Sequence, residues 1–337
     1  MILVTGGAGY IGSHTVVELL NNNKEVVVCD DLSNSSEKVL DRVYTITGKK
    51  VIFYKYNICN YEQMKEIFQN NKIDSIIHFA GFKAVGESVS KPYEYYQNNI
   101  DSTLILLRLM KEFGVNNLVF SSSATVYGNP KALPIKEDFE LSATNPYGRT
   151  KLFIEYILKD MAYANKNLNI ALLRYFNPIG AHASGLIGES PNGTPNNLMP
   201  YITQVAIGKL EYLNVFGNDY NTHDGTGVRD YIHVCDLARG HLLALNKLDT
   251  NPGLVIYNLG TGVGYSVLDL VKTFGKVIGK DIPYKIVSRR PGDIDACYAD
   301  PTLAYKELGF KTQFDLEDMC KDSWKWQSNN PKGYEEK

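Results

Sequence analysis

The sequence predicts a doubly wound α/β fold, in which one parallel β-sheet carries helices on both faces, followed by a smaller C-terminal α/β domain. Two observations predict the larger part: strand-length apolar runs alternate with helix-length segments over residues 1–176, and a glycine cluster follows the first run. A third observation predicts the boundary, because residues 177–200 are rich in Gly, Pro, Asn and Ser. We expect one domain over residues 1–176, joined by parts of 230–260, and a second domain over residues 177–337.

The first predicted strand and the turn after it carry the most informative motif. Residues 2–12 read I-L-V-T-G-G-A-G-Y-I-G, so that Gly6, Gly9 and Gly12 are spaced G-x-x-G-x-x-G. Glycine accepts positive φ angles and lets a phosphate approach the backbone. A helix that starts at such a turn directs N–H groups and the positive end of its dipole at that phosphate. The motif therefore predicts a phosphate-binding turn.

The second predicted strand supplies the other half of a dinucleotide-binding pattern. Residues 25–29 read E-V-V-V-C and lead into Asp30 and Asp31. An acid at this strand end accepts hydrogen bonds from an adenosine ribose and repels a 2′-phosphate. No arginine follows before Arg42. The pattern predicts a Rossmann domain that binds NAD rather than NADP.

The remaining predicted elements complete the sheet and its helices. Strands are expected at residues 50–54, 74–79, 117–121 and 169–175, and helices at residues 11–20, at 61–69, over an amphipathic stretch ending at 113, and from 146 onward. A late apolar strand at residues 254–257 is expected to return to the sheet. Residues 177–200 are expected to form long loops, and Ser266 is expected to cap a helix after the tight turn at residues 260–264.

Composition excludes several classes of protein. The net charge is −2 with both signs interspersed, so neither nucleic acid nor an anionic membrane is an expected partner. No run of about 18 apolar residues predicts a membrane span, and a strand at residue 2 leaves no room for a signal peptide. The five cysteines lack C-x-x-C spacing, which indicates reduced thiols and a cytoplasmic location. The six histidines form no metal-ligand pattern, so no metal is expected.

Residues 145–151, N-P-Y-G-R-T-K, contain a candidate catalytic pair. Asn145 is a predicted N-cap and Pro146 suits the first helical position, which places Tyr147 and Lys151 on one face of a helix. A nearby ammonium favours the phenolate, so we expect Lys151 to lower the pKa of Tyr147, and the positive ring of oxidised nicotinamide to lower it further. The predicted result is a phenol that acts as a general base near neutral pH.

The Y-x-x-x-K motif also occurs at residues 61–65 and 127–131, so it does not identify a site by itself. Only Tyr147 has a chemical companion, the serines at residues 121–123, which follow the fifth predicted strand over the expected cofactor site. A hydroxyl at that place can bridge the phenol and a substrate hydroxyl. Together with the dinucleotide pattern, this combination predicts an active site.

These motifs in this order resemble the extended short-chain dehydrogenase/reductase superfamily. Longer phrases resemble the UDP-hexose 4-epimerase family within it: T-G-G-A-G-Y-I-G-S-H, H-F-A-G-F-K-A-V-G-E-S, F-S-S-S-A-T-V-Y-G, A-L-L-R-Y-F-N-P-I-G-A-H, P-N-N-L-M-P-Y and G-T-G-V-R-D-Y-I-H-V. The likeness runs from Ile2 to about Tyr334. It implies that a homodimer interconverts UDP-galactose and UDP-glucose through a 4-keto intermediate, with NAD that stays tightly bound.

The resemblance also implies three sets of site residues. The catalytic set is Ser123, Tyr147 and Lys151. The cofactor-binding set is Gly6, Gly9, Tyr10, Ile11, Gly12, Asp30, Asp31, Asn34, Ser35, Asn57, Ile58, Phe79, Ala80, Gly81, Lys83, Asn98, Ser121, Tyr147, Lys151 and Tyr175. The substrate-binding set is Lys83, Ser123, Tyr147, Asn177, Asn197, Leu198, Phe216, Arg229, Tyr231, Arg290, Asp293 and Cys297. The arginines suit this role, because a guanidinium fork matches diphosphate oxygens.

Two of these positions bear on affinity and substrate range. The family commonly has Asp at the position of Asn57, where it contacts the adenine amino group; an amide oxygen can accept the same bond, whereas an amide NH₂ presented there would hold NAD less firmly. Cys297 corresponds to a position beside the 2-substituent of the sugar, where a tyrosine leaves little room. A cysteine leaves space for an N-acetyl group, so UDP-GalNAc and UDP-GlcNAc are expected to be substrates as well.

Two other functions stay open at this point. A nucleotide-sugar 4,6-dehydratase needs an acid/base pair to eliminate water, and such enzymes carry Asp-Glu where residues 123–126 read S-A-T-V, without a carboxylate. A non-catalytic NAD-binding protein is expected to lack at least one of Tyr147, Lys151 and Ser123, and this chain has all three.

Overall fold

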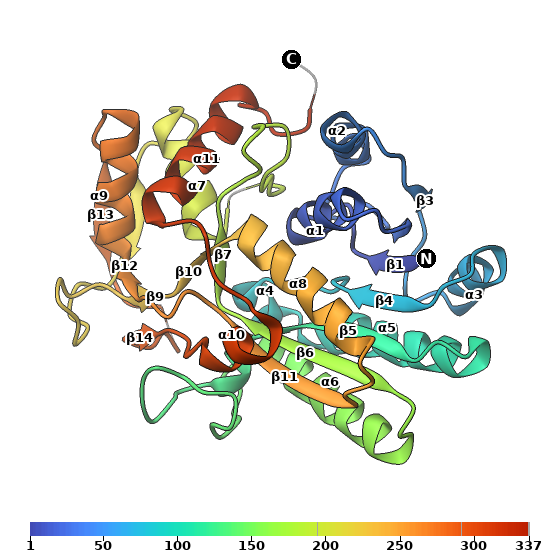
Figure 1. The fold of residues 1–337 in the computed structure, drawn as a ribbon. Coiled ribbons are helices and arrows are strands. Elements are labelled where there is room, and N and C mark those ends of the chain that lie inside the picture. The colour runs from blue at the N-terminus through green and yellow to red at the C-terminus, as the bar shows by residue number, and fades with distance from the viewer. Residues whose placement is uncertain (194, 291, 336–337) are drawn as a thin grey trace.

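The computed structural model describes residues 1–193, 195–290 and 292–335 (Figure 1). Its main sheet has seven strands in the order β3-β2-β1-β4-β5-β6-β11, all parallel. The strands are β1 (Ile2–Thr5), β2 (Val26–Cys29), β3 (Ile52–Tyr54), β4 (Ser75–His78), β5 (Asn117–Ser123), β6 (Asn169–Tyr175) and β11 (Leu254–Leu259). The predicted doubly wound fold is confirmed. Because the strand order reverses between β1 and β4, the ligand crevice of such a fold lies at their carboxyl ends.

Helices cover both faces of this sheet (Figure 1). One face packs against α1 (Tyr10–Asn21), α2 (Lys38–Thr47) and α8 (Val234–Leu248), and the other against α3 (Tyr61–Asn70), α5 (Pro92–Phe113) and α6 (Pro146–Ala164). Successive strand residues point to opposite faces. Val4 accordingly packs in the first core and Leu3 in the second, both fully buried. Such two-sided burial explains why the strands are continuous apolar runs.

The C-terminal half forms smaller sheets packed against three helices. The strand pairs are β7 (Asn177–Ile179) with β10 (Tyr231–His233) and β8 (Leu213–Phe216) with β13 (Tyr284–Val287), while β9 (Val228–Arg229) lies between β12 (Tyr265–Ser266) and β14 (Ala296–Cys297). Helices α7 (Leu198–Ala206), α9 (Val267–Ile278) and α11 (Leu316–Asn329) share a separate core with them. Figure 1 shows this half on the side of the molecule away from β3.

Parts of the C-terminal half of the chain return to the main sheet. β11 pairs with β6 in parallel from Leu254 to Leu259, as expected for the late strand. α8 packs beside α1, and α10 (Thr302–Leu308) packs against β11 and α8. The chain therefore crosses between its two halves more than once.

Several local features differ from the sequence-based expectations. α2 was not predicted, and the amphipathic segment before Phe113 is two helices, α4 (Val85–Ser90) and α5. The break falls at Lys91, because the residue before a proline is disfavoured in the helical region, and Pro92 starts the next helix. The expected loops at 177–200 contain the short strand β7 and the start of α7. No helix among the described residues is long and apolar enough to cross a membrane.

Candidate active site

The glycine turn joins β1 to α1 with little space for side chains. Gly6 has φ +70°, and a Cβ on Gly12 would lie 2.2 Å from the Gly6 carbonyl oxygen. The N-cap of α1 is Gly9, which provides no side-chain cap. Because these glycines have no side chains, the turn and the first residues of the helix can lie in close contact, as a phosphate-binding turn requires.

The two aspartates after β2 have different surroundings. Asp30 is buried, and its carboxylate accepts hydrogen bonds from the Ala8 N–H (3.0 Å), the Leu32 N–H (3.0 Å) and the Ser35 hydroxyl (2.8 Å). Burial raises the pKa of Asp30, and these bonds oppose that shift. Asp31 is exposed and accepts a local hydrogen bond from the Ser33 N–H (2.9 Å). Asp30 therefore fixes the glycine turn, whereas Asp31 is the aspartate more accessible to a ribose.

Arg42, the first arginine after these acids, is engaged elsewhere. Its guanidinium donates to the Leu186 carbonyl (2.9 Å) and to the Asn330 side chain (2.8 Å). It also lies 4.9 Å from the ring centre of Tyr334 and 5.5 Å from that of Trp326. These contacts tie α2 to the end of α11, so Arg42 is not placed to hold a 2′-phosphate.

The segment after β4 is fixed by a residue that the sequence analysis missed. Asn99, buried in α5, accepts a hydrogen bond from the Phe82 N–H (2.8 Å) and donates to the Phe82 carbonyl (3.1 Å) and the Thr150 hydroxyl (3.0 Å). Gly81 has φ +157°, and its missing Cβ would lie 3.1 Å from Asn99. The neighbouring Asn98 donates to the same side chain. Asn99 thus joins the predicted cofactor segment to the helix that carries Tyr147.

The other predicted cofactor residues surround the same strand ends. The Tyr10 hydroxyl donates to the Gly180 carbonyl (2.7 Å). The Asn57 amide oxygen accepts from the Cys59 N–H (2.8 Å), so one of its two lone pairs is in use. His241 of α8, also missed, packs on the rings of Phe79 (4.7 Å) and Tyr175 (5.6 Å). Ile58 is buried and Asn34 is exposed.

The candidate catalytic helix starts as the sequence predicts. The Asn145 side chain accepts from the Gly148 N–H (2.8 Å), and Pro146 is the first residue of α6. Tyr147 is half-buried in the first turn and its hydroxyl is hydrogen-bonded to Ser123, the last residue of β5. The structure therefore brings together the predicted phenol and the predicted serine.

The expected direction of the Tyr147 pKa shift was wrong for this arrangement. Burial raises the pKa of Tyr147, and the hydrogen bond with Ser123 offsets only part of that shift. The Lys151 ammonium is directed to the Ser121 carbonyl at 2.7 Å, where it lies 4.8 Å from the Phe120 ring centre. Burial lowers the pKa of Lys151 to about 8. The ammonium is thus held by the strand backbone rather than by the phenol.

Below these residues lies a buried ionic network that the sequence analysis missed. Arg174 of β6 and Glu155 of α6 form a two-pronged pair with N···O distances of 2.9 and 2.6 Å, and both are almost fully buried. Glu155 also accepts from the Ser122 hydroxyl (2.6 Å), and Arg174 donates to the Tyr127 hydroxyl (2.9 Å). Glu155 lies one turn beyond Lys151, and that spacing was a signal available in the sequence. Next to this network, the Ser121 and Tyr175 hydroxyls are in close contact.

The predicted substrate arginines meet at one aspartate. Asp293 accepts from Arg290 (2.9 Å) and pairs with Arg229 (3.4 Å), and the Arg290 guanidinium lies 4.9 Å from the Phe216 ring centre. In the β9–β14 pair, Cys297 lies opposite Arg229. These residues form a cationic group at the ends of short strands, which suits a diphosphate. Tyr231 is buried in the adjacent strand β10, and Asn177 and Leu198 begin β7 and α7.

Lys83 and Asn197, predicted to bind substrate from the two halves of the chain, meet at Glu189, which the sequence analysis also missed. One carboxylate oxygen of Glu189 lies 3.2 Å from the Lys83 ammonium and accepts a hydrogen bond of 2.7 Å from the Asn197 amide. Glu189 comes from the loop-rich segment between β7 and α7, and its side chain is 10% exposed. Nothing in the local sequence pattern singles it out.

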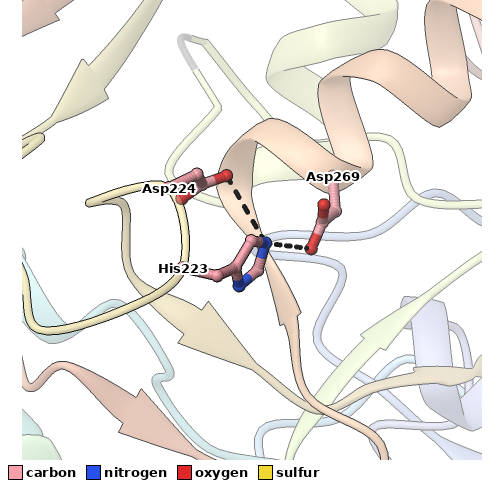
Figure 2. Close-up of side chains that lie close together, drawn as sticks. All are labelled: His223, Asp224 and Asp269. Atoms are coloured by element: carbon pink, nitrogen blue, oxygen red, sulfur yellow. Dashed lines mark ion pairs between the residues drawn. The ribbon is translucent and has the colours of Figure 1, made fainter.

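Among the described residues, one group has the donor atoms of a metal site: His223, Asp224 and Asp269 (Figure 2). His223 Nε2 lies 3.1 Å from Asp269 and 3.8 Å from Asp224. Both carboxylates already accept hydrogen bonds from Ser266, whose N–H and side chain form the predicted cap of α9 with Asp269. The group therefore has a structural role at the start of α9.

Comparisons with known proteins all match the chain to enzymes that act on nucleotide sugars. A family model described as GDP-mannose 4,6 dehydratase matches residues 3–323. The UDP-glucose 4-epimerase of Pasteurella multocida is 64% identical over 334 residues, which are 99% of each chain. The Bifidobacterium longum UDP-glucose 4-epimerase, solved in complex with NAD+ and UDP, superposes with a TM-score of 0.96 at 54% identity, over 98% of this chain and 99% of that one. The UDP-Glc/GlcNAc 4-epimerase of Campylobacter jejuni gives a TM-score of 0.85 at 35% identity, over 97% and 99%.

The dehydratase description applies to the broad family model, whereas these relatives and solved structures are epimerases. The segment that starts at Ser123 also carries no carboxylate in the stretch S-A-T-V, so the acid/base pair of a dehydratase is missing there. Sequence identity of 64% over nearly the whole of both chains supports the more specific of the two assignments, the epimerase. The chain belongs to the UDP-glucose 4-epimerase family.

Proposed function

We propose that this protein interconverts UDP-galactose and UDP-glucose by inverting C4 of the hexose through a 4-keto intermediate, with tightly bound NAD. The single observation that carries the proposal is the hydrogen-bonded pair of Tyr147 and Ser123 at the carboxyl end of β5, within a doubly wound sheet that begins with a glycine turn. Ligands of such sheets bind at the carboxyl ends of the strands.

The residues present fit NAD. The close contact between Gly6 and Gly12 leaves only backbone atoms at the expected phosphate position. Asp31 is exposed at the end of β2, where a ribose would lie. Arg42 is hydrogen-bonded elsewhere, so it does not favour a 2′-phosphate. Lys151, Ser121 and Tyr175 would border the nicotinamide ribose, and Phe79 and Asn98 the remainder of the cofactor. Bound NAD supplies an acceptor for the hydride of C4 and returns that hydride to the opposite face.

The reacting hydroxyl is managed by the phenol and the serine. Tyr147 takes the proton of the sugar 4-hydroxyl and gives it back at the end of the reaction, while Ser123 bridges the phenol and that hydroxyl. Burial raises the pKa of Tyr147 in this structure, so the phenol needs positive charge nearby to act as a base. The proposed sources of that charge are Lys151, which the Ser121 carbonyl fixes nearby in the fold, and the positive ring of oxidised nicotinamide.

The nucleotide is anchored away from the reacting carbon. Arg229 and Arg290, held together by Asp293, would grip the diphosphate, with Phe216 against the base. An anchored diphosphate lets the 4-keto hexose turn within the pocket and present its other face. Residues 1–176 with parts of 230–260 would form the NAD-binding domain, and residues 177–337 the domain that holds the UDP-sugar.

The substrate range is proposed to include UDP-GalNAc and UDP-GlcNAc. Cys297 lies opposite Arg229 and packs beside the small core formed by Val126, Tyr127 and Phe176. A cysteine occupies much less volume than a tyrosine, which leaves room for an N-acetyl group at this place.

We also propose a homodimer in the cytoplasm. Large apolar side chains are exposed on α4, α5 and α6, among them Val89 (65%), Tyr93 (69%) and Tyr156 (47%), and Tyr96 stacks on Phe153 between α5 and α6. Apolar side chains gathered on neighbouring helices favour burial against a second copy. The cysteines are all free, which suits a reducing compartment. Sedimentation analysis measures the mass of the protein in solution, which should be that of two chains.

The activity is tested by adding UDP-galactose, without NAD, to the purified protein and following UDP-glucose by chromatography. We expect turnover without added cofactor and NAD in the supernatant after denaturation, because the reaction regenerates NAD. No UDP-glucose with or without added NAD would contradict the proposal. Bound NAD without turnover would instead indicate a binding protein.

A further inference from the structure

Glu189 connects two predicted ligand residues that come from different halves of the chain. Lys83 follows β4 of the main sheet, and Asn197 precedes α7 of the C-terminal half. Both reach the same oxygen of Glu189, Lys83 at 3.2 Å and Asn197 at 2.7 Å. The side chain of Glu189 is 10% exposed, whereas that of Lys83 is 50% exposed. The carboxylate is therefore the fixed partner of the pair.

The hydrogen bond between Asn197 and Glu189 changes how the helix α7 begins. Asn197 is the N-cap of α7, with extended backbone angles of φ −90° and ψ 147°, yet its side chain makes no capping hydrogen bond. Asparagine at this position normally accepts a bond from the second or third N–H of its helix. Here the side-chain amide instead donates to Glu189. Glu189 thus turns the Asn197 side chain away from the helix that it would otherwise cap.

Glu189 is itself held on its other sides. Its backbone carbonyl accepts a hydrogen bond of 3.0 Å from the Trp326 indole. Glu189 lines a small cavity with Tyr10 and Gly180. Burial raises the pKa of Tyr10, and the charge of Glu189 raises it further. Tyr10 belongs to the predicted cofactor set, so Glu189 lies where the cofactor half and the substrate half of the site meet.

We propose that Glu189 is a positioning residue for the nucleotide sugar: its carboxylate holds the Lys83 ammonium and the Asn197 amide in one arrangement across the two halves of the site. This inference rests on the proposed function, because Lys83 and Asn197 belong to the substrate-binding set that the resemblance to the epimerase family implies. Glu189 itself touches neither substrate nor reacting atoms. Its effect reaches the substrate through the two side chains that it orients.

The substitution Glu189→Gln tests the role of the negative charge of Glu189 while it keeps the size of the side chain. The glutamine keeps an oxygen for Asn197 and loses the charge that holds Lys83. We expect the KM for UDP-galactose and the Kd for UDP to rise about tenfold, the size expected for one lost charge-assisted hydrogen bond. We expect kcat to stay within about twofold. The matched control is Glu112→Gln, which removes a carboxylate paired with Lys65 at 2.6 Å at the far end of α5, and which should change none of these values.

A double substitution tests whether Glu189 acts through Lys83. In a Lys83→Met background, Glu189→Gln should change KM and Kd by less than about twofold, because the charged partner is already gone. The inference is overturned if Glu189→Gln leaves KM and Kd unchanged, or if its full effect persists without Lys83. A lowered melting temperature with unchanged KM would also overturn it, since that indicates a purely structural role. Failure of the proposed function is seen separately, as absence of turnover in the wild-type protein.

Discussion

Tyr147 is the side chain that meets the reacting hydroxyl in the proposed chemistry, and its environment shows what it depends on. Burial raises the pKa of its phenol. Among the described residues, only Ser123 opposes that shift through a hydrogen bond. Lys151 is buried against the Ser121 carbonyl, and burial lowers its pKa to about 8. A base is therefore available near neutral pH only when positive charge is brought close to the phenol.

The substitution Tyr147→Phe removes the titrating hydroxyl and keeps the ring. Turnover of UDP-galactose should fall by at least ~10²-fold, the low end for loss of a general acid/base group, while calorimetry should show unchanged UDP affinity. Tyr163→Phe is the matched control, because Tyr163 lies on the same helix with its side chain exposed. Near-normal turnover of Tyr147→Phe would show that another group is the base.

Cys297 is the residue at which substrate range is tested. The ratio of activity on UDP-GalNAc to activity on UDP-galactose should fall by at least about tenfold in Cys297→Tyr, because the larger ring fills the space proposed for the N-acetyl group. Cys297→Ser keeps the size and should keep the ratio. If the wild-type protein does not use acetylated sugars, the proposed range is wrong. If the tyrosine variant keeps the original ratio, Cys297 is not the limiting position.

At the scale of elements, α6 is the helix whose placement matters most, and two kinds of contact fix it. Its start is local in sequence: Asn145 caps the first turn and Pro146 occupies the first position. Its packing is not local, since Glu155 is joined to Arg174 of β6 and to Ser122 of β5. The ionic network therefore sets the distance of the helix, and so of Tyr147, from the two strands.

The substitution Glu155→Ala should lower the free energy of unfolding by about 3–5 kcal/mol, because it leaves the Arg174 guanidinium buried without its partner. The double substitution Glu155→Leu with Arg174→Met should be less destabilising than Glu155→Ala, since no charge is left uncompensated. Urea unfolding of the three proteins measures both effects. A loss below about 1 kcal/mol in Glu155→Ala would mean that the pair does not hold the helix.

The elements that were predicted well are those whose signals are local. β6 begins at Asn169 and ends at Tyr175, as expected from the apolar stretch I-A-L-L within it, and Ser266 caps α9. The break before Pro92 was missed although the proline signals it. Of the acids after β2, the sequence could not show that Asp30 turns back to the Ala8 N–H, because this contact depends on how two strands are placed side by side. Glu189 and Arg174 escaped prediction for the same reason.

For the whole molecule, three buried histidines around the main sheet make the stability of the fold depend on pH. His14 of α1, His78 of β4 and His241 of α8 are all buried, and burial lowers their pKa values to about 3, 3 and 4. Each is therefore neutral in the folded protein at pH 5, whereas a histidine in the unfolded chain is protonated below about pH 6.5. The fold must become less stable as the medium becomes acidic.

The sign follows from proton binding. The unfolded chain binds more protons than the folded one between about pH 6.5 and pH 3–4. The free energy of unfolding therefore rises with pH over this range and falls when the solution is acidified. Each histidine should contribute a loss of about 2 kcal/mol between pH 7 and pH 5. His241→Gln should reduce the steepness of this dependence in urea unfolding. A stability that is equal at pH 5 and pH 7 would contradict the assignment of neutral buried histidines.

In the proposed reaction C4 of the sugar loses a hydride and later regains the same hydride, which does not exchange with water in between. UDP-galactose that carries deuterium at C4 is converted in ordinary water, and the UDP-glucose formed is analysed by mass spectrometry and NMR. The product should keep its deuterium at C4, because bound NAD would hold the transferred deuterium until it is returned to the other face of the sugar. Replacement of that deuterium by hydrogen from water would contradict it.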